Sequence, residues 1–406
     1  MTKCILCGEP KVVRFLDLGS TALANKFVAA EDLHRAEATF PLRVGFCSEC
    51  HHVQLTDEVP PTALFDDYLY ISSMSDTLVR HLHGLSDTVV KRFKLGPTDL
   101  VTDVGCNDGT LLRGFARHGV KILGVEPAQN LARLSQRAGL PVVVDYFGTE
   151  SAKRLRAENG PASAITLTNV FPHLPFLNDF MQGVDTFLAP NGVLVIEAHY
   201  LRDLLEQRAF DTVYHEHVSY WALGPMARLF ARHGFEIVDV ERLPVHHGQV
   251  RVFAQRKGVG QTSTNVTRLM AEEKTAGMDK LATFQRFANE VLDLKTQLDS
   301  QIARIRAEGK TVVAYGAPAK GSTLLSYFGI GPDRIRYIAD KSPLKQGRYT
   351  PGTHIPVVGP ERLMEDQPDY VLLLAWNFAD EIMEQQAAYR ARGGRFIIPV
   401  PEVRVV

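Results

Sequence analysis

The chain has 406 residues, of which 45% are hydrophobic and 22% are charged, and its formal net charge at pH 7 is -1. This balanced charge offers no electrostatic footprint for nucleic acid or a membrane surface, so we expect neither partner and look to small-molecule ligands. No apolar run approaches the ~20 residues of a membrane span, and the first residues lack a signal peptide's hydrophobic region, so we predict a cytoplasmic protein. The length indicates two or three domains.

Two Cys-x-x-Cys pairs open the chain, Cys4 with Cys7 and Cys47 with Cys50. Four thiolates in two such pairs suit a tetrahedral structural Zn²⁺ with no open position, although separate core thiols or a redox pair would show the same spacing. The stretches 15–20 and 40–46 between the pairs alternate like strands. We therefore predict a zinc ribbon over residues 1–60, in which the metal compensates for a small core.

A stretch rich in Tyr and Ser, residues 68–75, precedes a helix predicted over residues 78–93. The stretch could simply cap that helix through Ser75 or Asp76. The stretch could equally form a lid over a cofactor.

The centre of the chain is organised around residues 99–110, where a short apolar strand is followed by Gly105, Gly109 and the start of a helix. Glycines allow a tight turn and close approach of a ligand, so strand, turn and helix together predict a cofactor crevice. The spacing is neither the Gly-x-Gly-x-x-Gly of dinucleotide sites nor a phosphate loop. A second strand ends about 21 residues after Gly105 in Glu126, whose carboxylate we expect to accept both hydroxyls of a ribose.

Strands and helices alternate from residue 98 to 258, with strands predicted over 99–104, 121–125, 141–145, 162–168, 192–197 and 249–255. This alternation predicts a parallel, doubly wound α/β sheet with its ligands at the carboxyl ends of the strands. Asp145, after the third strand, could hold the amine of an adenine or only form a turn. The predicted cofactor domain spans residues 61–258.

The densest set of proton-transfer groups is Tyr214-His-Glu-His217. It lacks the His-Glu-x-x-His spacing of a zinc site. Extended, it would place Tyr214 and Glu216 on one face and the two histidines on the other; helical, it would make Tyr214 and His217 neighbours. A histidine here could act as a base with Glu216 orienting it, against the alternative of structural histidines.

The segment 243–253 carries His246, His247 and Arg251 on a hairpin-like element. These side chains could contact an anionic substrate or simply lie on the surface. From about residue 259 to 308 the composition is that of long helices, whose Leu and Phe stripe we predict to be core.

A third unit begins at residue 310, where a strand, Gly316, Gly321 and a helix repeat the central pattern. Lys320, Ser322 and Thr323 stand at the helix entrance, which favours phosphate through its backbone N–H groups and the lysine charge. Strands predicted over 335–339, 370–376 and 395–399 complete a smaller Rossmann-like α/β sheet, with Asn377 at a strand end. Residues 259–406 are thus predicted to hold a second nucleotide-like site, with a purely structural turn as the alternative.

Together the motifs resemble the C-methyltransferases of nucleotide-linked 4-keto deoxysugars. The resemblance is carried by residues 4–7, 47–50, 103–109, 214–217, 315–320 and 353–357. It implies an N-terminal zinc domain, a central class I methyltransferase domain for S-adenosylmethionine and a C-terminal domain for the nucleotide sugar. The chain departs from the family at residues 246–249, which read His-His-Gly-Gln where the family often has His-Gly-Gly-Ser.

The resemblance also assigns residues. The cofactor positions it implies are Asp103, Gly105, Asn107, Gly109, Glu126, Asp145 and Asn169. Its base is His217, with Tyr214, Glu216, His173 and Tyr70 near the reacting centre. The substrate positions that we predict, mostly from the patterns described above and not from the resemblance, are Tyr214, His215, His246, Arg251, Lys320, Ser322 and Asn377.

These residues suggest a reaction. A 4-keto group acidifies the C3–H, so His217 could remove that proton and the resulting enolate could take a methyl group from S-adenosylmethionine. We therefore predict C-3 methylation of a nucleotide-linked 4-keto-6-deoxy sugar, with dTDP as carrier, by a monomeric enzyme. A sugar isomerase or ring-rearranging enzyme without methyl transfer, or a zinc-ribbon binding module with a vestigial cofactor site, are the competing hypotheses.

Overall fold

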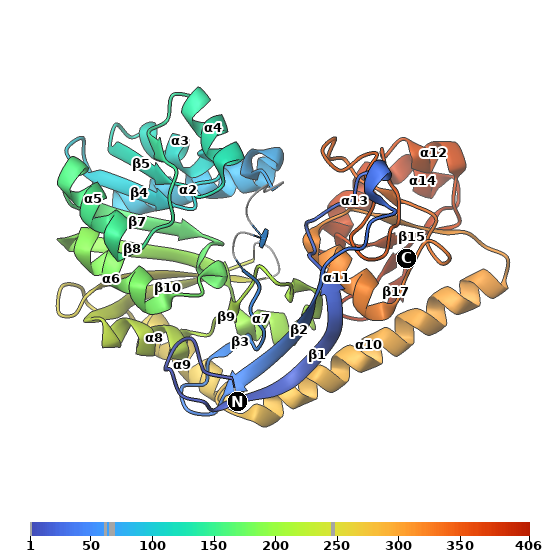
Figure 1. Cartoon of the computed structure of the whole chain (residues 1–406), viewed down its shortest axis with the longest axis horizontal. Coiled ribbons are helices and arrows are strands. Elements are labelled where there is room, and N and C mark those ends of the chain that lie inside the picture. The colour runs from blue at the N-terminus through green and yellow to red at the C-terminus, as the bar shows by residue number, and fades with distance from the viewer. Residues whose placement is uncertain (1, 61–62, 65–69, 245–247) are drawn as a thin grey trace.

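The computed structural model describes residues 2–60, 63–64, 70–244 and 248–406. Its sheets form an N-terminal ribbon, a central sheet and a C-terminal sheet, and Figure 1 shows the ribbon rising between the other two. Helix α10 (Leu281–Ala307) runs along one side and connects the central unit to the C-terminal unit (Figure 1). The predicted fold class, an α/β chain with a zinc-binding start and a class I methyltransferase centre, is confirmed.

The N-terminal ribbon is antiparallel. Its strands lie in the order β1 (Val12–Ala22), β2 (Thr39–Cys47), β3 (Val53–Leu55) and β9 (Ser219–Tyr220). Strand β9 comes from the middle of the chain and was not predicted. Because β9 directly follows the Tyr214-His-Glu-His217 segment, its pairing with β3 joins that segment to the ribbon.

The apolar faces of β1 and β2 share a core with the C-terminal half of the chain. Leu16 and Phe46 belong to one buried cluster with side chains of α10 and of the C-terminal sheet. The rings of Phe46 and Phe284 are stacked with their centroids 4.9 Å apart. The expectation of a small separate core is therefore wrong: alternation showed which face of each strand is apolar, but not the distant helix that covers it.

The central sheet has strand order β10-β11-β8-β7-β4-β5-β6. Its strands are β4 (Leu100–Val104), β5 (Lys121–Val125), β6 (Val142–Val143), β7 (Ala162–Thr168), β8 (Leu188–His199), β10 (Phe235–Leu243) and β11 (Gln249–Arg256). The sheet is mixed rather than wholly parallel, because β11 runs antiparallel to both β8 and β10. Strand β10 was not predicted.

Both faces of this sheet are buried, which explains the nearly continuous apolar strands. Val101 packs with α2 and α3 on one face, whereas Leu100 and Val104 pack with α5, α6 and α8 on the other. The helices of this unit are α2 (Asp76–Phe93), α3 (Thr110–Ala116), α4 (Gln129–Arg137), α5 (Thr149–Asn159), α6 (Leu177–Phe187), α7 (Leu201–Glu206) and α8 (Leu223–Arg232). Ser75 caps α2 by accepting from the backbone N of Leu78.

The C-terminal sheet has strand order β14-β13-β12-β15-β16-β17, parallel except for its last strand. Its strands are β12 (Val312–Tyr315), β13 (Ile338–Ala339), β14 (Val357–Val358), β15 (Tyr370–Leu373), β16 (Arg395–Ile398) and β17 (Arg404–Val405). Its helices are α11 (Ala319–Phe328), α12 (Arg362–Asp366), α13 (Ala379–Gln385) and α14 (Ala387–Ala391).

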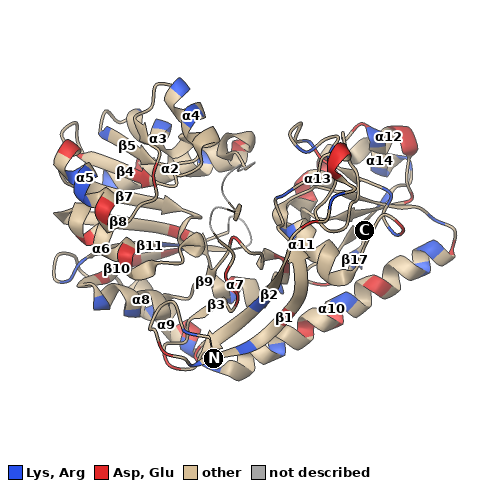
Figure 2. Ribbon diagram, viewed as in Figure 1, with Lys and Arg blue, Asp and Glu red and all other residues tan. Residues whose placement is uncertain are grey.

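The connecting segment forms α9 (Thr264–Thr275) and α10. The stripe of α10 is buried core, as the sequence suggested, and includes Phe284, Val291 and Leu298. Its outer face carries interspersed acidic and basic residues, a pattern repeated over both flanking units (Figure 2). In the described part of the chain, none of the helices is long and apolar enough to cross a bilayer.

Candidate active site

A cavity of about 1090 Å³ lies between the carboxyl ends of the central and C-terminal sheets. Its walls come from the turns after β4, β5, β7 and β8, from the segment 212–217, and from the turns after β12 and β15. Parallel strands end at the same edge of their sheet, and here two such edges contribute to one cavity. A cavity of this size can hold two ligands at once.

At the central-sheet end of the cavity, the turn after β4 approaches closely to its neighbours. Gly105 has φ +68, and a Cβ on it would lie 2.4 Å from Cγ2 of Val170. Asn107 also takes a positive φ, of 53. Its backbone N donates to Oε2 of Glu126 (2.8 Å), while Oε1 of Glu126 accepts from the backbone N of Ala128 (2.9 Å). The carboxylate of Glu126 is thus fixed at the cavity wall with lone pairs left for ribose hydroxyls.

Other predicted cofactor residues have separate positions. Asp103 lines the cavity, accepts from Thr166 Oγ1 (2.7 Å), and has its pKa raised to about 7, chiefly by burial. Asp145 also lines the cavity and is paired with Arg154. Among the described residues, Gly109 is not part of the wall; it precedes α3 with φ 77 and shapes the turn.

Asn169 lines the cavity in a left-handed conformation, φ 59. Its Oδ1 accepts from Nε2 of Gln249 at 2.7 Å. Gln249 is one of the positions at which the chain departs from the family pattern, so this departure affects the site through Asn169.

The segment before α2 is tied to the cofactor turn. Asn107 Nδ2 donates to the carbonyl O of Tyr70 (3.0 Å), and Asn107 Oδ1 accepts from the backbone N of Ser72 (3.0 Å). Tyr70 and Ser72 both line the cavity. One asparagine therefore shapes the turn and holds this segment over it.

The middle of the cavity is a cluster of aromatic and imidazole rings. The ring centroid of His217 lies 4.0 Å from that of Tyr214 and 5.0 Å from those of His173 and His199. All these residues line the cavity. Sequence reasoning did not single out His199, although it stands at the carboxyl end of β8, where a ligand contact is expected.

The tautomer of His217 follows from its hydrogen bond. Nδ1 lies 2.8 Å from the carbonyl O of Thr212, and because a carbonyl can only accept, Nδ1 carries the hydrogen and Nε2 keeps its lone pair. Burial, and next the nearby His173, lower the pKa of His217 to about 3. Burial also raises the pKa of Tyr214 well above its usual value. His217 is thus neutral with a free acceptor nitrogen, and Tyr214 is a hydroxyl donor.

The other two members of the tetrad turn away from the cavity. His215 Nε2 donates to the carbonyl O of Phe40 (3.2 Å), and in the described part of the chain His215 is not among the residues of the cavity wall. Glu216 is buried and its Oε1 accepts from Nδ2 of Asn25 at 2.7 Å. Of His215, Glu216 and Asn25, only Asn25 lines the cavity. It follows β1 in the ribbon, and no local pattern in the sequence marked it.

The opposite end of the cavity carries cationic side chains. Lys320 at the start of α11 lies with Nζ 4.2 Å from the ring centroid of Trp376, and burial lowers the pKa of Lys320 to about 8. Lys345, which the sequence did not single out, donates to the carbonyl O of Ala317 (2.6 Å). Asn377 completes this end. Ser322 is buried within α11 and, in the described part of the chain, is not part of the wall.

Arg251 is buried in ion pairs and, among the described residues, is not part of the cavity wall. Its Nε donates to Oε1 of Glu197 (2.5 Å) and its Nη1 to Oε2 of Glu241 (2.7 Å), on the neighbouring strands β8 and β10. Glu197 also pairs with Nε2 of His81 (2.7 Å). The predicted substrate contact of Arg251 thus finds no support in the described cavity wall, and its acidic partners could not be seen locally. His246 and His247 lie outside the described residues.

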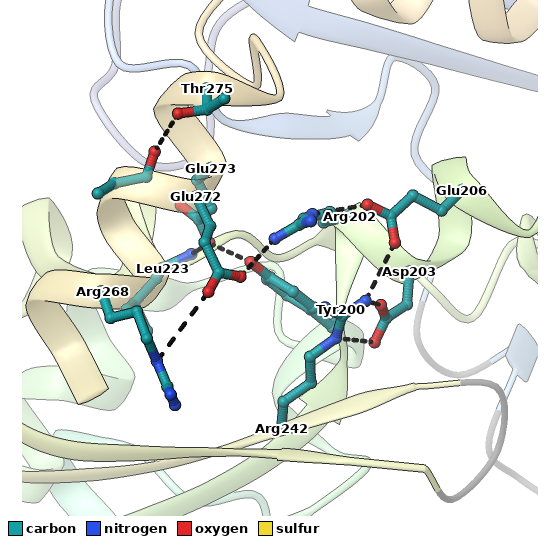
Figure 3. Close-up of polar contacts among 11 residues, drawn as sticks. Tyr200, Arg202, Asp203, Glu206, Leu223, Arg242, Arg268, Glu272, Glu273 and Thr275 are labelled. Carbon is teal, nitrogen blue, oxygen red and sulfur yellow. Dashed lines mark hydrogen bonds and ion pairs between the residues drawn. The ribbon is translucent and has the colours of Figure 1, made fainter.

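A polar network holds the chain where it leaves β8 at His199 (Figure 3). The hydroxyl of Tyr200 donates to Oε1 of Glu273 (3.0 Å), and Nη1 of Arg202 pairs with Oε2 of Glu272 (2.7 Å). Both acids lie on α9. This network fixes the end of β8, and with it the ring cluster, against the helix.

The four cysteines of the two N-terminal pairs come together. The Sγ atoms of Cys4, Cys7, Cys47 and Cys50 all lie within 4.8 Å of one another, at 3.5 Å for Cys4–Cys50 and 3.6 Å for Cys7–Cys47. A tetrahedral zinc with Zn–S bonds of about 2.3 Å separates its sulfurs by about 3.8 Å, so the set fits the metal. His52, which follows the second pair closely in sequence, is not part of this cluster among the described residues; its ring packs on Trp221 with centroids 4.6 Å apart.

Three family descriptions match successive parts of the chain. Residues 4–65 match "Putative zinc binding domain", residues 79–240 match "Methyltransferase domain", and residues 244–401 match "C-methyltransferase C-terminal domain". The matches follow the order of the ribbon, the central unit and the C-terminal unit.

The chain is also similar to the C-methyltransferase NovU of Streptomyces niveus, with 36% identity over 405 residues that cover 100% of this chain and 96% of the relative. Among solved structures, the chain is similar to two over about half of its length. The PH0226 protein of Pyrococcus horikoshii OT3 is 16% identical and covers 49% of this chain and 97% of its own (TM-score 0.38). The magnesium protoporphyrin IX methyltransferase of Synechocystis PCC 6803, solved with bound SAM, is 15% identical; the match covers 48% of this chain and 88% of that one (TM-score 0.33).

Proposed function

Since this chain belongs to the C-methyltransferase family, we propose that its substrate is a nucleotide-linked 4-keto-6-deoxy sugar and that the methyl group goes to C-3. The observation that carries the proposal is His217, held as a neutral imidazole between two strand-end sites of one cavity. An enzyme that only bound a sugar would not need an unprotonated acceptor nitrogen there.

The enzyme uses S-adenosylmethionine, which supplies an electrophilic methyl group. We assign its ribose to Glu126, because that carboxylate is oriented by two backbone N–H groups at the end of β5. Gly105 lets the turn after β4 pack closely against Val170, and Asp103, Asn107, Asp145 and Asn169 complete this end of the cavity. Two bound reactants held in one cavity supply much of the rate through proximity.

In the proposed reaction, Nε2 of His217 takes the proton from the carbon next to the ketone. The charge that develops on the ketone oxygen needs hydrogen-bond donors. Tyr214 is such a donor, since its raised pKa keeps the hydroxyl protonated and its ring lies against His217. His173 and Tyr70 remain proposed neighbours of the reacting centre, and Glu216 acts from behind the turn rather than inside the cavity.

We place the nucleotide at the C-terminal end of the cavity, where Lys320 and Asn377 lie at strand and helix ends. The ammonium of Lys320 and the start of α11 favour phosphate. The dTDP carrier, the monomeric state and the cytoplasmic location remain predictions from the sequence.

The proposal is tested by incubating the protein with S-adenosylmethionine and dTDP-, GDP- or CDP-linked 4-keto-6-deoxyhexoses and weighing the sugar by mass spectrometry. We expect a gain of one methyl group on at least one carrier. An unchanged mass with a changed sugar would favour the isomerase, and failure to bind S-adenosylmethionine in calorimetry would favour the binding module.

The pH profile gives a separate prediction. Because the pKa of His217 lies at about 3, the base stays unprotonated as the pH falls, so protonation of His217 should not lower kcat/KM for the sugar between pH 8 and 5. An unshifted histidine would be half protonated near pH 6.5. Above pH 8 the sugar KM should rise, since Lys320 loses its charge there. Circular dichroism at each pH controls for unfolding. Since the pKa of Asp103 is about 7, the profile is also measured for Asp103→Asn at saturating S-adenosylmethionine, and an acid limb near pH 6.5 that persists in this variant would contradict the assignment.

A further inference from the structure

The segment immediately before the base belongs structurally to the C-terminal unit. Arg208 Nη1 donates to the carbonyl O of Pro401 (3.3 Å), and Thr323 Oγ1 donates to the carbonyl O of Val213 (3.1 Å). Between them, the 3-10 helix η4 (Phe210–Thr212) packs on α11, where the ring of Phe210 stacks on Phe328 with centroids 5.2 Å apart. The position of this segment is therefore set by the C-terminal unit.

Within this segment Asp211 is fully buried, with 0% of its surface exposed. Its Oδ2 accepts from Nε1 of Trp376 at 2.6 Å. The same indole ring also contacts Lys320, whose Nζ lies 4.2 Å from the ring centroid. One tryptophan thus contacts a buried carboxylate through its N–H and a cavity-lining ammonium through its π face.

The same carboxylate stands next to the group that orients the base. Thr212, the residue after Asp211, provides the carbonyl O that accepts from Nδ1 of His217 at 2.8 Å. Asp211 and Thr212 are adjacent in η4, so the bond between Asp211 and Trp376 anchors the short turn that carries this carbonyl. The carbonyl decides which nitrogen of His217 carries the proton.

We propose that Asp211 and Trp376 are positioning residues, which join the Lys320 end of the cavity to the Thr212 carbonyl and so hold His217 in its base-competent tautomer. The inference rests on the proposed role of His217 as the base. Neither residue needs to touch the reacting carbon.

Charge balance supports the arrangement. A buried ammonium loses hydration, and Asp211 opposes the resulting fall in the pKa of Lys320. In turn Lys320 and the Trp376 N–H oppose the rise that burial causes in the pKa of Asp211. Among the described titratable groups, Tyr214 is the further one that senses the charge of Asp211. An uncharged pair of similar shape would pack as well but would not hold an ammonium at the cavity wall.

The test measures the proton-transfer half of the reaction alone. Protein without a methyl donor is placed in D₂O with dTDP-4-keto-6-deoxyglucose, and NMR follows deuterium entering the carbon next to the ketone. Trp376→Phe keeps a ring but removes the N–H, whereas Asp211→Ala removes the acceptor and Asp211→Asn retains one. Tyr327→Phe is the matched control, since it removes a ring hydroxyl at the same junction while leaving the Phe210 packing in place.

We expect Trp376→Phe and Asp211→Ala to exchange about ten- to a hundredfold more slowly, the cost of a misplaced catalytic group, with Asp211→Asn between them and wild type. Affinity for S-adenosylmethionine and the melting temperature should stay near wild type in Trp376→Phe. Wild-type exchange in both Trp376→Phe and Asp211→Ala, while His217→Asn is inactive, would overturn the inference and leave the proposed function intact. Exchange that persists in His217→Asn would instead overturn the proposed function.

Discussion

His217→Asn is expected to lower kcat for methyl transfer by about 10²- to 10⁴-fold, the usual contribution of a positioned general base. Asparagine can still donate toward the Thr212 carbonyl and nearly fills the space, but it offers no nitrogen lone pair for the proton on carbon. The prediction follows from the buried, neutral imidazole and its 2.8 Å bond to Thr212. Steady-state kinetics with the active nucleotide sugar measure it.

The matched control is His215→Asn, two residues earlier in the same turn. Its side chain points to the carbonyl of Phe40 and not into the cavity, so kcat should change far less than for His217→Asn. Calorimetry should give the same affinity for S-adenosylmethionine in both variants. Equal losses in the two variants would show that the turn as a whole, rather than one imidazole, had been damaged.

Loss of the zinc should have the largest effect on stability. Cys47→Ser removes a thiolate that is 0% exposed and lies at the end of β2. Structural zinc contributes roughly 10 kcal/mol in small peptide domains; even a third of that would lower Tm by roughly 5 to 10 °C. The loss should spread beyond the two cysteine pairs, because Arg232 on α8 donates to the carbonyl O of Leu6, between Cys4 and Cys7 (2.5 Å).

Cys106→Ser is the control for this experiment, because Cys106 is buried outside the four-thiol cluster. Metal analysis should find one zinc per chain in wild type and in Cys106→Ser, and much less in Cys47→Ser. Calorimetric melting then gives the difference in Tm. A zinc-free Cys47→Ser protein that melts at the wild-type temperature would refute a structural role for the metal.

Local patterns predicted the elements that carry their own signal. The strand, turn and acid that surround Gly105 and Glu126 are contiguous motifs, and both residues line the cavity. Strand β9 has two residues and exists because it pairs with β3, 165 positions earlier at Gln54 and Ser219. Such short strands depend on their context more than on local propensity. Apolar and polar residues alternate only in part along β10, because its pairing with β11 is irregular between Ile237 and Asp239.

The sequence could not locate some side chains of the site, because their contacts are with residues far away in the sequence. In the sequence, Arg251 is a cationic side chain beside a hairpin and could contact an anion. In the structure, Glu197 and Glu241 on the adjacent strands pair with its guanidinium. Asn25 reaches the cavity from the ribbon. Trp376 meets Asp211 across 165 residues. Such pairs become visible only when the sheets are assembled.

The most direct test follows the methyl group itself. S-adenosylmethionine labelled with ¹³C in its methyl group is incubated with the enzyme and an accepted keto sugar, and the product is examined by ¹³C–¹H NMR. The label should appear as a methyl bonded to the carbon beside the ketone, with the hydrogen of that carbon gone. A label found on oxygen, or on a carbon not adjacent to the ketone, would contradict an enolate formed by His217.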